Sequence, residues 1–167
     1  MTTRWMTYAS PIGPMVLAGR EDGLIGAWIV GQAHFGGVLP DWREDPADAS
    51  LCAAARQLDE WFGGCRTAFD LPLAAVGTCF QRAVWAQIAR VGFGETRDYG
   101  SVGAALGKPG SARAVGAATG RNPFTIIVPC HRLVARNGAL TGYAGGLERK
   151  RALLAFEAGS RPFRFAG

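Results

Sequence analysis

Three short runs of apolar, β-branched and aromatic residues open the chain and predict a small sheet. They cover Arg4 to Ala9, Met15 to Ala18 and Leu24 to Val30. Residues 11–14 (PIGP) interrupt the pattern after the first run, and residues 21–23 (EDG) have the composition of a hairpin turn. The first part of the chain is therefore expected to consist of strands joined by tight turns.

Two helices are predicted from the apolar pattern that follows. Apolar positions recur at helical spacing from Ala49 to Phe62, and two glycines then end the pattern. A second helix is predicted from Cys79 to Arg90, because Thr78 and Gln81 form the T-x-x-Q signature of a capping box ahead of an apolar stripe.

Two further short helices are predicted in residues 99–120, which read YGSVGAALGKPGSARAVGAATG. Ser101 could cap the first and Ser111 the second, with a turn at residues 108–110 between them. Two short helices around a tight, glycine-containing turn in a basic context are typical of a helix-turn-helix. A generic helical hairpin would show the same pattern.

The second of these short helices carries one long side chain, Arg113, among alanines and glycines. A helix face this small can approach a narrow groove, where Arg113 could enter a base stack or pair with a phosphate. The alternative is a surface arginine on an alanine-rich packing helix.

Charge is divided unevenly along the chain. Residues 1–77 hold 5 Arg or Lys against 9 Asp or Glu, whereas residues 78–167 hold 13 against 4, which gives net charges of −4 and +9. A basic half beside an acidic one indicates a polyanionic partner, and nucleic acid is the first candidate. A genome rich in G and C would explain why arginine is preferred to lysine, but not the asymmetry.

The cysteines and the N-terminus predict a reduced, cytoplasmic protein. None of the four cysteines lies in a CxxC pair, and no basic segment followed by an apolar one opens the chain. No apolar stretch approaches the roughly 18 residues that a membrane helix needs, so no membrane partner is expected. His34, Cys52 and Cys65 could be imagined as metal ligands, but their spacing fits no common zinc pattern, and neither a metal nor a cofactor is expected.

The candidate chemistry lies in IIVPCHRL, residues 126–133. Because Pro129 favours an extended residue before it, Ile126 to Val128 is predicted to be a short buried strand, with Cys130 just past its end. Cys130 and His131 can act together only if the chain turns between them or a water bridges them. An imidazole that takes the thiol proton would lower the effective thiol pKa and produce a nucleophile.

A carboxylate in the last predicted helix, Leu147 to Ala158, could orient this histidine. Helical spacing places Glu157 on the apolar side of the helix, where a charge needs a partner. His131 is the partner that a cysteine-histidine-acid relay would use, and a salt bridge to Arg132 or Arg136 is the alternative.

A glycine-rich segment connects the cysteine to this helix. Asn137-Gly138 has the composition of a hairpin turn. Beyond it, Tyr143 could form one wall of a pocket for a flat ring, and Gly145-Gly146 would let backbone N–H groups face a ligand.

Taken together, these motifs resemble the O6-alkylguanine-DNA alkyltransferases. The match runs from GTCFQ at residue 77 through GETRDYG, KPGSARAVGAATGRNP, IVPCHRLV, NGALTGYAGG and RKRALLAFE, over about the C-terminal half. The N-terminal half is similar to that family only in general layout, with SPIGPMVLAG the closest stretch. The resemblance implies an α+β protein: a small ribonuclease-H-like α/β domain at residues 1–77, then a mainly helical, winged-helix-like domain with a helix-turn-helix at residues 78–167.

The resemblance also implies repair of DNA by direct damage reversal. An alkyl group would pass from O6-alkylguanine in double-stranded DNA, bound through the minor groove, to Cys130 in one irreversible step that consumes the protein. By the same resemblance, His131 would act as base through a water, Glu157 would orient His131, and Asn122 would brace the turn near Cys130.

Substrate contacts follow from the resemblance as well. Tyr99 would hydrogen-bond the flipped guanine at N3, while Tyr143 and the backbone of Ala144 would line the pocket and contact O6. The backbone carbonyls of the acceptor cysteine and Leu133 would accept from the exocyclic amine. Thr125 would lie at the edge of the pocket and leaves the size of accepted alkyl groups open.

On the DNA side, the resemblance implies that Arg113 fills the gap left by the flipped nucleotide. Ser111, Ala112 and Gly116 of the same helix, together with Tyr99, would contact the DNA. The zinc found in some relatives lacks its ligand pattern here. A monomer is expected, while clustering along DNA and repair of O4-alkylthymine are left open.

Two rival functions use the same features differently. A non-catalytic relative that binds alkylated DNA and signals to other repair factors would lack the acceptor, so Cys130 argues against it. A papain-like hydrolase would also use cysteine and histidine, but the adjacency of Cys130 and His131 and the helix-turn-helix argue against that function.

Overall fold

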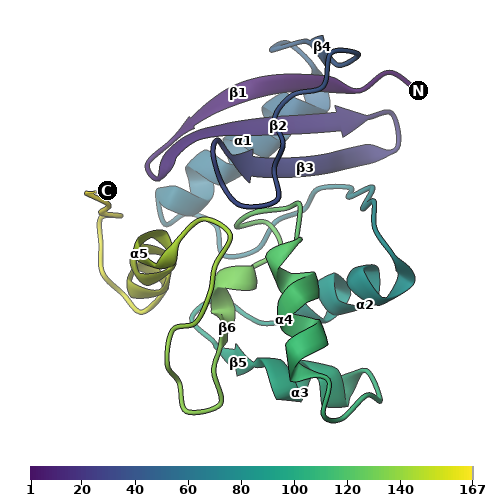
Figure 1. Cartoon of the computed structure of the whole chain (residues 1–167). Coiled ribbons are helices and arrows are strands. Elements are labelled where there is room, and N and C mark those ends of the chain that lie inside the picture. Colours follow the sequence, from purple (N-terminus) through teal and green to yellow (C-terminus); the bar gives the residue numbers. More distant parts are fainter. Residues whose placement is uncertain (167) are drawn as a thin grey trace.

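The computed structural model describes residues 1–166 and consists of two stacked halves (Figure 1). In the N-terminal half, β1 (Arg4–Ser10), β2 (Gly13–Arg20) and β3 (Gly23–Ile29) form an antiparallel meander. The two-residue β4 (Arg43–Glu44) pairs with β1 in parallel, so the order across the sheet is β3-β2-β1-β4. The three predicted strands are confirmed, and β2 is longer at both ends than predicted.

Helix α1 (Ala49–Phe62) covers one face of this sheet and has the predicted bounds. It begins there because the Asp48 carboxylate accepts hydrogen bonds from the backbone N–H groups of Ser50 and Leu51, each at 3.0 Å. Its apolar side enters the core through fully buried residues that include Leu58 and Trp61.

The loop between β3 and β4 crosses the opposite face of the sheet (Figure 1). Trp28 of β3 stacks on Phe35 of this loop, with ring centroids 4.7 Å apart, and its centroid lies 6.0 Å from that of Trp42. At its start the loop touches the other half of the molecule, because the backbone N–H of Ala33 donates to the carbonyl of Ala144 at 3.0 Å.

The C-terminal half is mainly helical, as predicted, and the α+β class is confirmed. The elements of this half are α2 (Cys79–Ile88), β5 (Arg97–Asp98), α3 (Tyr99–Ala105), α4 (Ala112–Gly120), a 3-10 turn (Cys130–Arg132), β6 (Leu133–Val134) and α5 (Leu147–Glu157). Helices α3 and α4 form the helix-turn-helix, and β5 and β6 pair in parallel. No helix in residues 1–166 is both long and apolar enough to cross a membrane.

The capping box at the start of α2 is confirmed. Thr78 Oγ1 accepts from the backbone N–H of Gln81 at 3.1 Å, and Gln81 Oε1 accepts from the N–H of Thr78 at 3.0 Å. The α-helix ends at Ile88, two residues before the predicted end.

The caps predicted for the helix-turn-helix are wrong in detail. Helix α3 begins before Ser101, which donates to the Asp98 carboxylate through its backbone N–H (2.9 Å) and its hydroxyl (2.6 Å), so Asp98 is the cap. Ser111 stands at the N-cap position of α4 as predicted, but its hydroxyl donates to the Lys108 carbonyl at 2.5 Å and closes the turn instead.

Hydrogen bonds join the two halves beside the sheet edge. The backbone N–H of Ala27 in β3 donates to the Pro123 carbonyl at 2.7 Å, and the N–H of Thr125 donates back to the Ala27 carbonyl at 3.0 Å. From α1, Trp61 packs edge-on against His131, with ring centroids 6.2 Å apart. The sheet half thereby contacts the chain on both sides of the cysteine.

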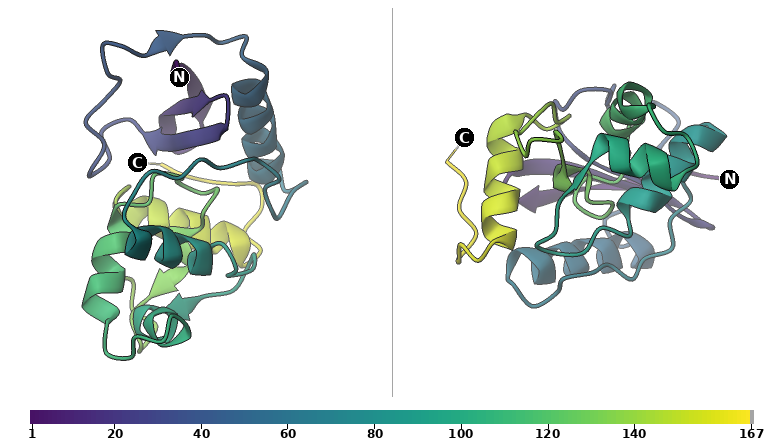
Figure 2. Two further views of the ribbon diagram at one scale, coloured as in Figure 1. Left: turned by 90° about the vertical axis from the view of Figure 1, so that its right-hand side faces the viewer. Right: turned by 90° about the horizontal axis from the view of Figure 1, so that it is seen from below.

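The segment after α5 lies along the boundary between the two halves (Figure 2). The Arg161 guanidinium stacks over the Phe156 ring at 3.8 Å, and Phe163 packs against both Phe156 and Phe62. This segment therefore fastens α5 to α1.

The strand predicted at Ile126 to Val128 is absent, and a compact turn takes its place. Ile126 has a positive φ of 72°, and the backbone N–H of Val128 donates to the Phe124 carbonyl at 2.9 Å. An apolar run this short shows that a segment is buried but not its conformation. The turn brings Cys130 back toward the centre of the molecule.

Candidate active site

Cys130 begins the 3-10 turn and lies on the wall of a cavity of about 460 Å³. The residue is only 6% exposed, yet a ligand that fills the cavity can reach it. The wall combines α4, the loop before α5 and the turn after β3, through Ala33, His34, Tyr99, Ala112, Arg113, Gly116, Thr119, Gly120, Cys130, Thr141, Gly142, Tyr143 and Ala144.

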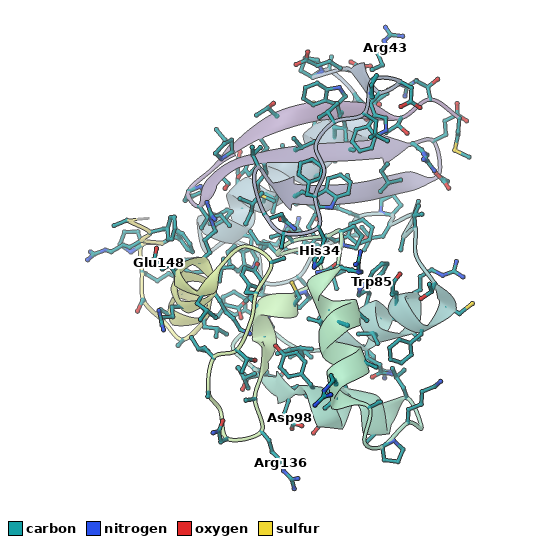
Figure 3. The ribbon with its side chains drawn as sticks, viewed as in Figure 1. His34, Arg43, Trp85, Asp98, Arg136 and Glu148 are labelled. Carbon is teal, nitrogen blue, oxygen red and sulfur yellow. The ribbon has the colours of Figure 1, made fainter. Side chains whose placement is uncertain are left out.

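Behind the cysteine, Glu157 is shared between two neighbouring residues. His131 Nε2 lies 3.1 Å from Glu157 Oε2, and Arg132 donates to both carboxylate oxygens over 2.6 to 3.0 Å. Arg132 also donates to the Val91 carbonyl at 2.5 Å. The histidine partner and the Arg132 alternative are thus both present, whereas Arg136 is exposed and lies elsewhere (Figure 3).

This arrangement defines the histidine tautomer. An ionised carboxylate only accepts hydrogen bonds, so Nε2 of His131 carries the hydrogen that faces Glu157. Within the described residues, the buried Nδ1 of His131 has no hydrogen-bond partner, and it therefore holds a free lone pair. Cys130 and His131 both lie in the 3-10 turn, so the chain turns between them, but only Cys130 lines the cavity.

Burial controls the charge states of the site. It raises the pKa of the Cys130 thiol, although Asn122 and Lys150 act in the opposite direction. Burial likewise lowers the pKa of His131, and Glu157 offsets this only in part. Both shifts favour the uncharged forms, a protonated thiol and a neutral imidazole, and whether the imidazole takes the thiol proton stays a prediction.

Glu157 remains the charged member of the group. Burial raises its pKa, but hydrogen bonds from His131 and Arg132 outweigh burial and hold the pKa below its usual value. The group therefore combines a fixed carboxylate, a neutral base and a protonated thiol.

Asn122 braces the turn that leads to Cys130. Its Nδ2 donates to the Val128 carbonyl at 2.8 Å, and its Oδ1 accepts from the backbone N–H of Phe124 at 2.9 Å. The side chain is buried and joins the two ends of the turn through these two hydrogen bonds.

Two tyrosines form part of the cavity wall, and burial raises the pKa of both, so both stay neutral phenols. The Thr141 hydroxyl lies 3.2 Å from the Tyr99 hydroxyl. The Tyr143 hydroxyl is buried without a hydrogen-bond partner among the described residues, and it lies close enough to Cys130 for each group to affect the other's pKa.

Helix α4 lines the cavity with small residues and one long side chain. Ala112, Arg113 and Gly116 line the wall, and Arg113 is exposed. A Cβ added to Gly116 would meet only the Tyr99 ring, at 3.9 Å. Ser111 does not line the cavity and serves the turn before α4.

Two residues implicated in substrate binding lie outside the cavity wall. The Leu133 carbonyl accepts from the fully buried Lys150 Nζ at 2.5 Å. Thr125 is 3% exposed, and its hydroxyl donates to Gln32 Oε1 at 2.9 Å. Any substrate contact through either residue stays a prediction.

Sequence reasoning missed Lys150 and the turn that carries Ala33 and His34. Lys150 lies in a run of basic residues, RKR, which is typical of a solvated helix face. Burial nevertheless lowers the pKa of Lys150, and the nearby Cys130 offsets this only in part. His34 is separated from Cys130 by most of the chain, and no local pattern links them. Within residues 1–166, no three His, Cys, Asp or Glu side chains gather as a metal site would require.

Two protein families match the chain. The family described as "6-O-methylguanine DNA methyltransferase, ribonuclease-like domain" matches residues 3–75. The family described as "6-O-methylguanine DNA methyltransferase, DNA binding domain" matches residues 79–159. Together these matches span most of the chain, including the cysteine and the helix-turn-helix.

Curated relatives named methylated-DNA--protein-cysteine methyltransferase match over nearly their full length. The protein from Mycobacterium tuberculosis (strain ATCC 25618 / H37Rv) is 44% identical over 158 residues, 95% of this chain and 94% of the relative. That from Methanosarcina barkeri is 45% identical over 149 residues, 89% and 92%. The constitutive protein from Bacillus subtilis is 38% identical over 156 residues, 90% and 92%.

Solved structures show the same likeness. Mycobacterium tuberculosis OGT in complex with DNA superposes with a TM-score of 0.86 at 44% identity, over 95% of this chain and 93% of that chain. The O6-methylguanine-DNA methyltransferase from Pyrococcus kodakaraensis strain KOD1, at 22% identity and a TM-score of 0.52, shares the fold.

Proposed function

The chain belongs to the 6-O-methylguanine DNA methyltransferase family, and from this premise we propose that it repairs DNA by direct damage reversal. It acts as a methylated-DNA–protein-cysteine methyltransferase that moves the alkyl group of O6-alkylguanine to Cys130. The observation that carries this proposal is Cys130 at the cavity wall with the His131–Glu157 pair behind it.

The reaction begins with the neutral thiol and imidazole. Nδ1 of His131 takes the Cys130 proton through a bridging water, and Glu157 stabilises the imidazolium that forms. The thiolate then attacks the alkyl carbon, so that an S–C bond forms while the C–O6 bond breaks and its electron pair stays on the guanine. The proton that the thiol loses balances the proton that the released guanine gains.

The transfer consumes the protein. A thioester can be hydrolysed, but the thioether formed on Cys130 has no comparable exit, so each molecule reacts once. The neutral phenol of Tyr99 donates a hydrogen bond to N3 of the guanine and helps to neutralise the purine as it leaves. Tyr143 and the backbone of Ala144 form part of the pocket wall and contact O6.

Access to the lesion requires base flipping, because O6 of a stacked guanine cannot reach a cysteine inside the protein. The small side of α4 suits the minor groove, and Arg113 fills the gap in the duplex. Lesions occur in any sequence context, so contacts to phosphate and backbone serve better than base readout. The same pocket could take O4-alkylthymine.

The remaining assignments concern the whole protein. We assign the unit boundary to residues 77 and 78, just before the capping box that starts α2. Four free cysteines suit a reducing compartment such as the cytoplasm. The protein is proposed to act as a monomer on DNA, without a cofactor.

Intact-mass measurement after incubation with duplex DNA that contains O6-methylguanine tests the proposal. A gain of one methyl group per molecule, located on Cys130 and absent in Cys130→Ser, is expected. Binding of the methylated duplex without any mass gain in the wild type would instead identify a non-catalytic relative that only recognises the lesion.

A further inference from the structure

The N-terminal half contributes directly to the cavity wall through the turn that follows β3. Ala33 and His34 of this turn line the same cavity as Cys130. Figure 3 shows His34 between the sheet and the helical half, near the end of α4 that points toward the sheet. No step of the reaction described above uses these residues.

Both halves of the molecule hold this turn in place. The side chain of Gln32 is buried, and its Oε1 accepts from the backbone N–H of Ile29 at 2.7 Å and from the Thr125 hydroxyl at 2.9 Å. The next residue, Ala33, donates its N–H to the Ala144 carbonyl at 3.0 Å. The turn is therefore fixed against the loop that carries Tyr143.

His34 adopts a backbone conformation that few residues with a side chain adopt. Its φ is 63°, in the left-handed region, where histidine is tolerated better than bulky β-branched residues but still at some cost. The residue is nevertheless exposed, so packing of its side chain does not explain the conformation. In this conformation the exposed residue forms part of the cavity wall.

We propose that His34 determines which alkyl groups the site accepts. This inference rests on the proposed function, in which the backbone of Ala144 contacts O6. Ala33 is hydrogen-bonded to Ala144, so the next residue, His34, lies where a group carried on O6 would extend. A methyl group is too short to press against this wall, whereas a bulky group would meet the imidazole.

The test compares transfer of methyl and benzyl groups from otherwise identical duplexes to three variants. His34→Gly removes the imidazole and tolerates the positive φ, and it is expected to raise the ratio of benzyl to methyl transfer rates at least about fivefold. His34→Trp places a larger side chain on the cavity wall and is expected to lower the ratio of benzyl to methyl transfer rates. Leu39→Ala, an exposed residue of the same loop outside the cavity wall, is the matched control and should keep the wild-type ratio.

The outcomes separate this inference from the proposed function. If the wild type transfers neither group, the proposed function itself fails. If the wild type transfers methyl groups but both His34 variants keep its benzyl-to-methyl ratio, the role of His34 is refuted while the repair function stands. Thermal melting of each variant shows that a changed ratio comes from a folded protein.

Discussion

The buried carboxylate of Glu157 pairs with two residues that the sequence presented as alternatives. Glu157 could pair with His131 for chemistry or with an arginine for stability, and the structure places His131 and Arg132 around the same carboxylate. Helical spacing predicted that Glu157 is buried. The second partner could not be chosen from the sequence, because the 3-10 turn that aligns residues 131 and 132 leaves no periodic signal.

Removal of the arginine should therefore destabilise the fold. Arg132→Met leaves the buried carboxylate with one neutral partner and is expected to lower the free energy of unfolding by about 3–5 kcal/mol, the usual cost of breaking a buried ion pair. Urea denaturation measures this loss. Arg136→Met, at an exposed position, is the control and should stay within about 0.5 kcal/mol of the wild type; equal losses in the two variants would contradict the prediction.

The stability of the protein should fall in weak acid. Because burial depresses the pKa of His131 in the folded state below 6.5, the unfolded chain takes up this proton first. The contribution is present above pH 6.5 and declines as the pH falls below it, with a slope of at most about 1.4 kcal/mol per pH unit. Glu157, whose folded pKa is also depressed, adds a second decline below pH 4.5.

Denaturation of wild type and His131→Gln between pH 7.5 and 5.5 measures the first decline. The variant has no group at this position that titrates, and its stability should change less over this range. The same slope in both proteins would show that the buried imidazole is not the source.

At the scale of elements, the segments that carry an apolar pattern or capping and turn residues of their own were predictable, whereas the two-residue strands and the turn at residues 126–128 were not. Helix α1 has the predicted bounds, and the capping box places the start of α2. By contrast, β4, β5 and β6 have two residues each, and strands this short exist only because a partner pairs with them. The turn at residues 126–128 depends on Asn122, which also acts from outside the segment.

Substitution of glycine by alanine should destabilise the helix-turn-helix at one position and not at another. A Cβ at Gly103 of α3 would collide with Ser111 Oγ and lie 3.0 Å from the Lys108 carbonyl, so Gly103→Ala is expected to cost about 1–3 kcal/mol. Gly116→Ala in α4 meets no such obstacle and should stabilise the helix by up to about 1 kcal/mol. Thermal melting distinguishes the two, and equal melting temperatures would contradict the prediction.

At the scale of the molecule, the basic half carries the helix-turn-helix and the acidic half carries the sheet. The sequence predicted this division, and it also predicted that Glu157 would pair with His131, next to Cys130 in the candidate site. It could not predict that the cavity is completed by the turn at His34, because hydrogen bonds between distant segments bring that turn to Ala144.

Arg113→Ala should separate DNA binding from base flipping. If this side chain fills the gap in the duplex, its loss should slow methyl transfer from duplex DNA at least about tenfold, because extrusion of a base costs a few kcal/mol. Affinity for unmodified duplex and its dependence on salt should change little, whereas a residue that pairs with phosphate would reduce the salt slope by about one. Transfer kinetics and salt titrations measure both quantities.

An equal slowing of transfer from the free alkylated base would contradict this prediction. The free base needs no extrusion, so a role limited to the duplex predicts a much smaller effect there.

The contrast between three exposed thiols and one enclosed thiol has a practical consequence. Cys52, Cys65 and Cys79 are open to a large maleimide in the native protein, while Cys130 is shielded. Labelling of unreacted protein should therefore add three tags before denaturation and four after it. A molecule whose Cys130 has been alkylated should carry three tags in both states. The fraction of molecules that gain a fourth tag on denaturation would therefore measure how much of a preparation still has an unmodified Cys130.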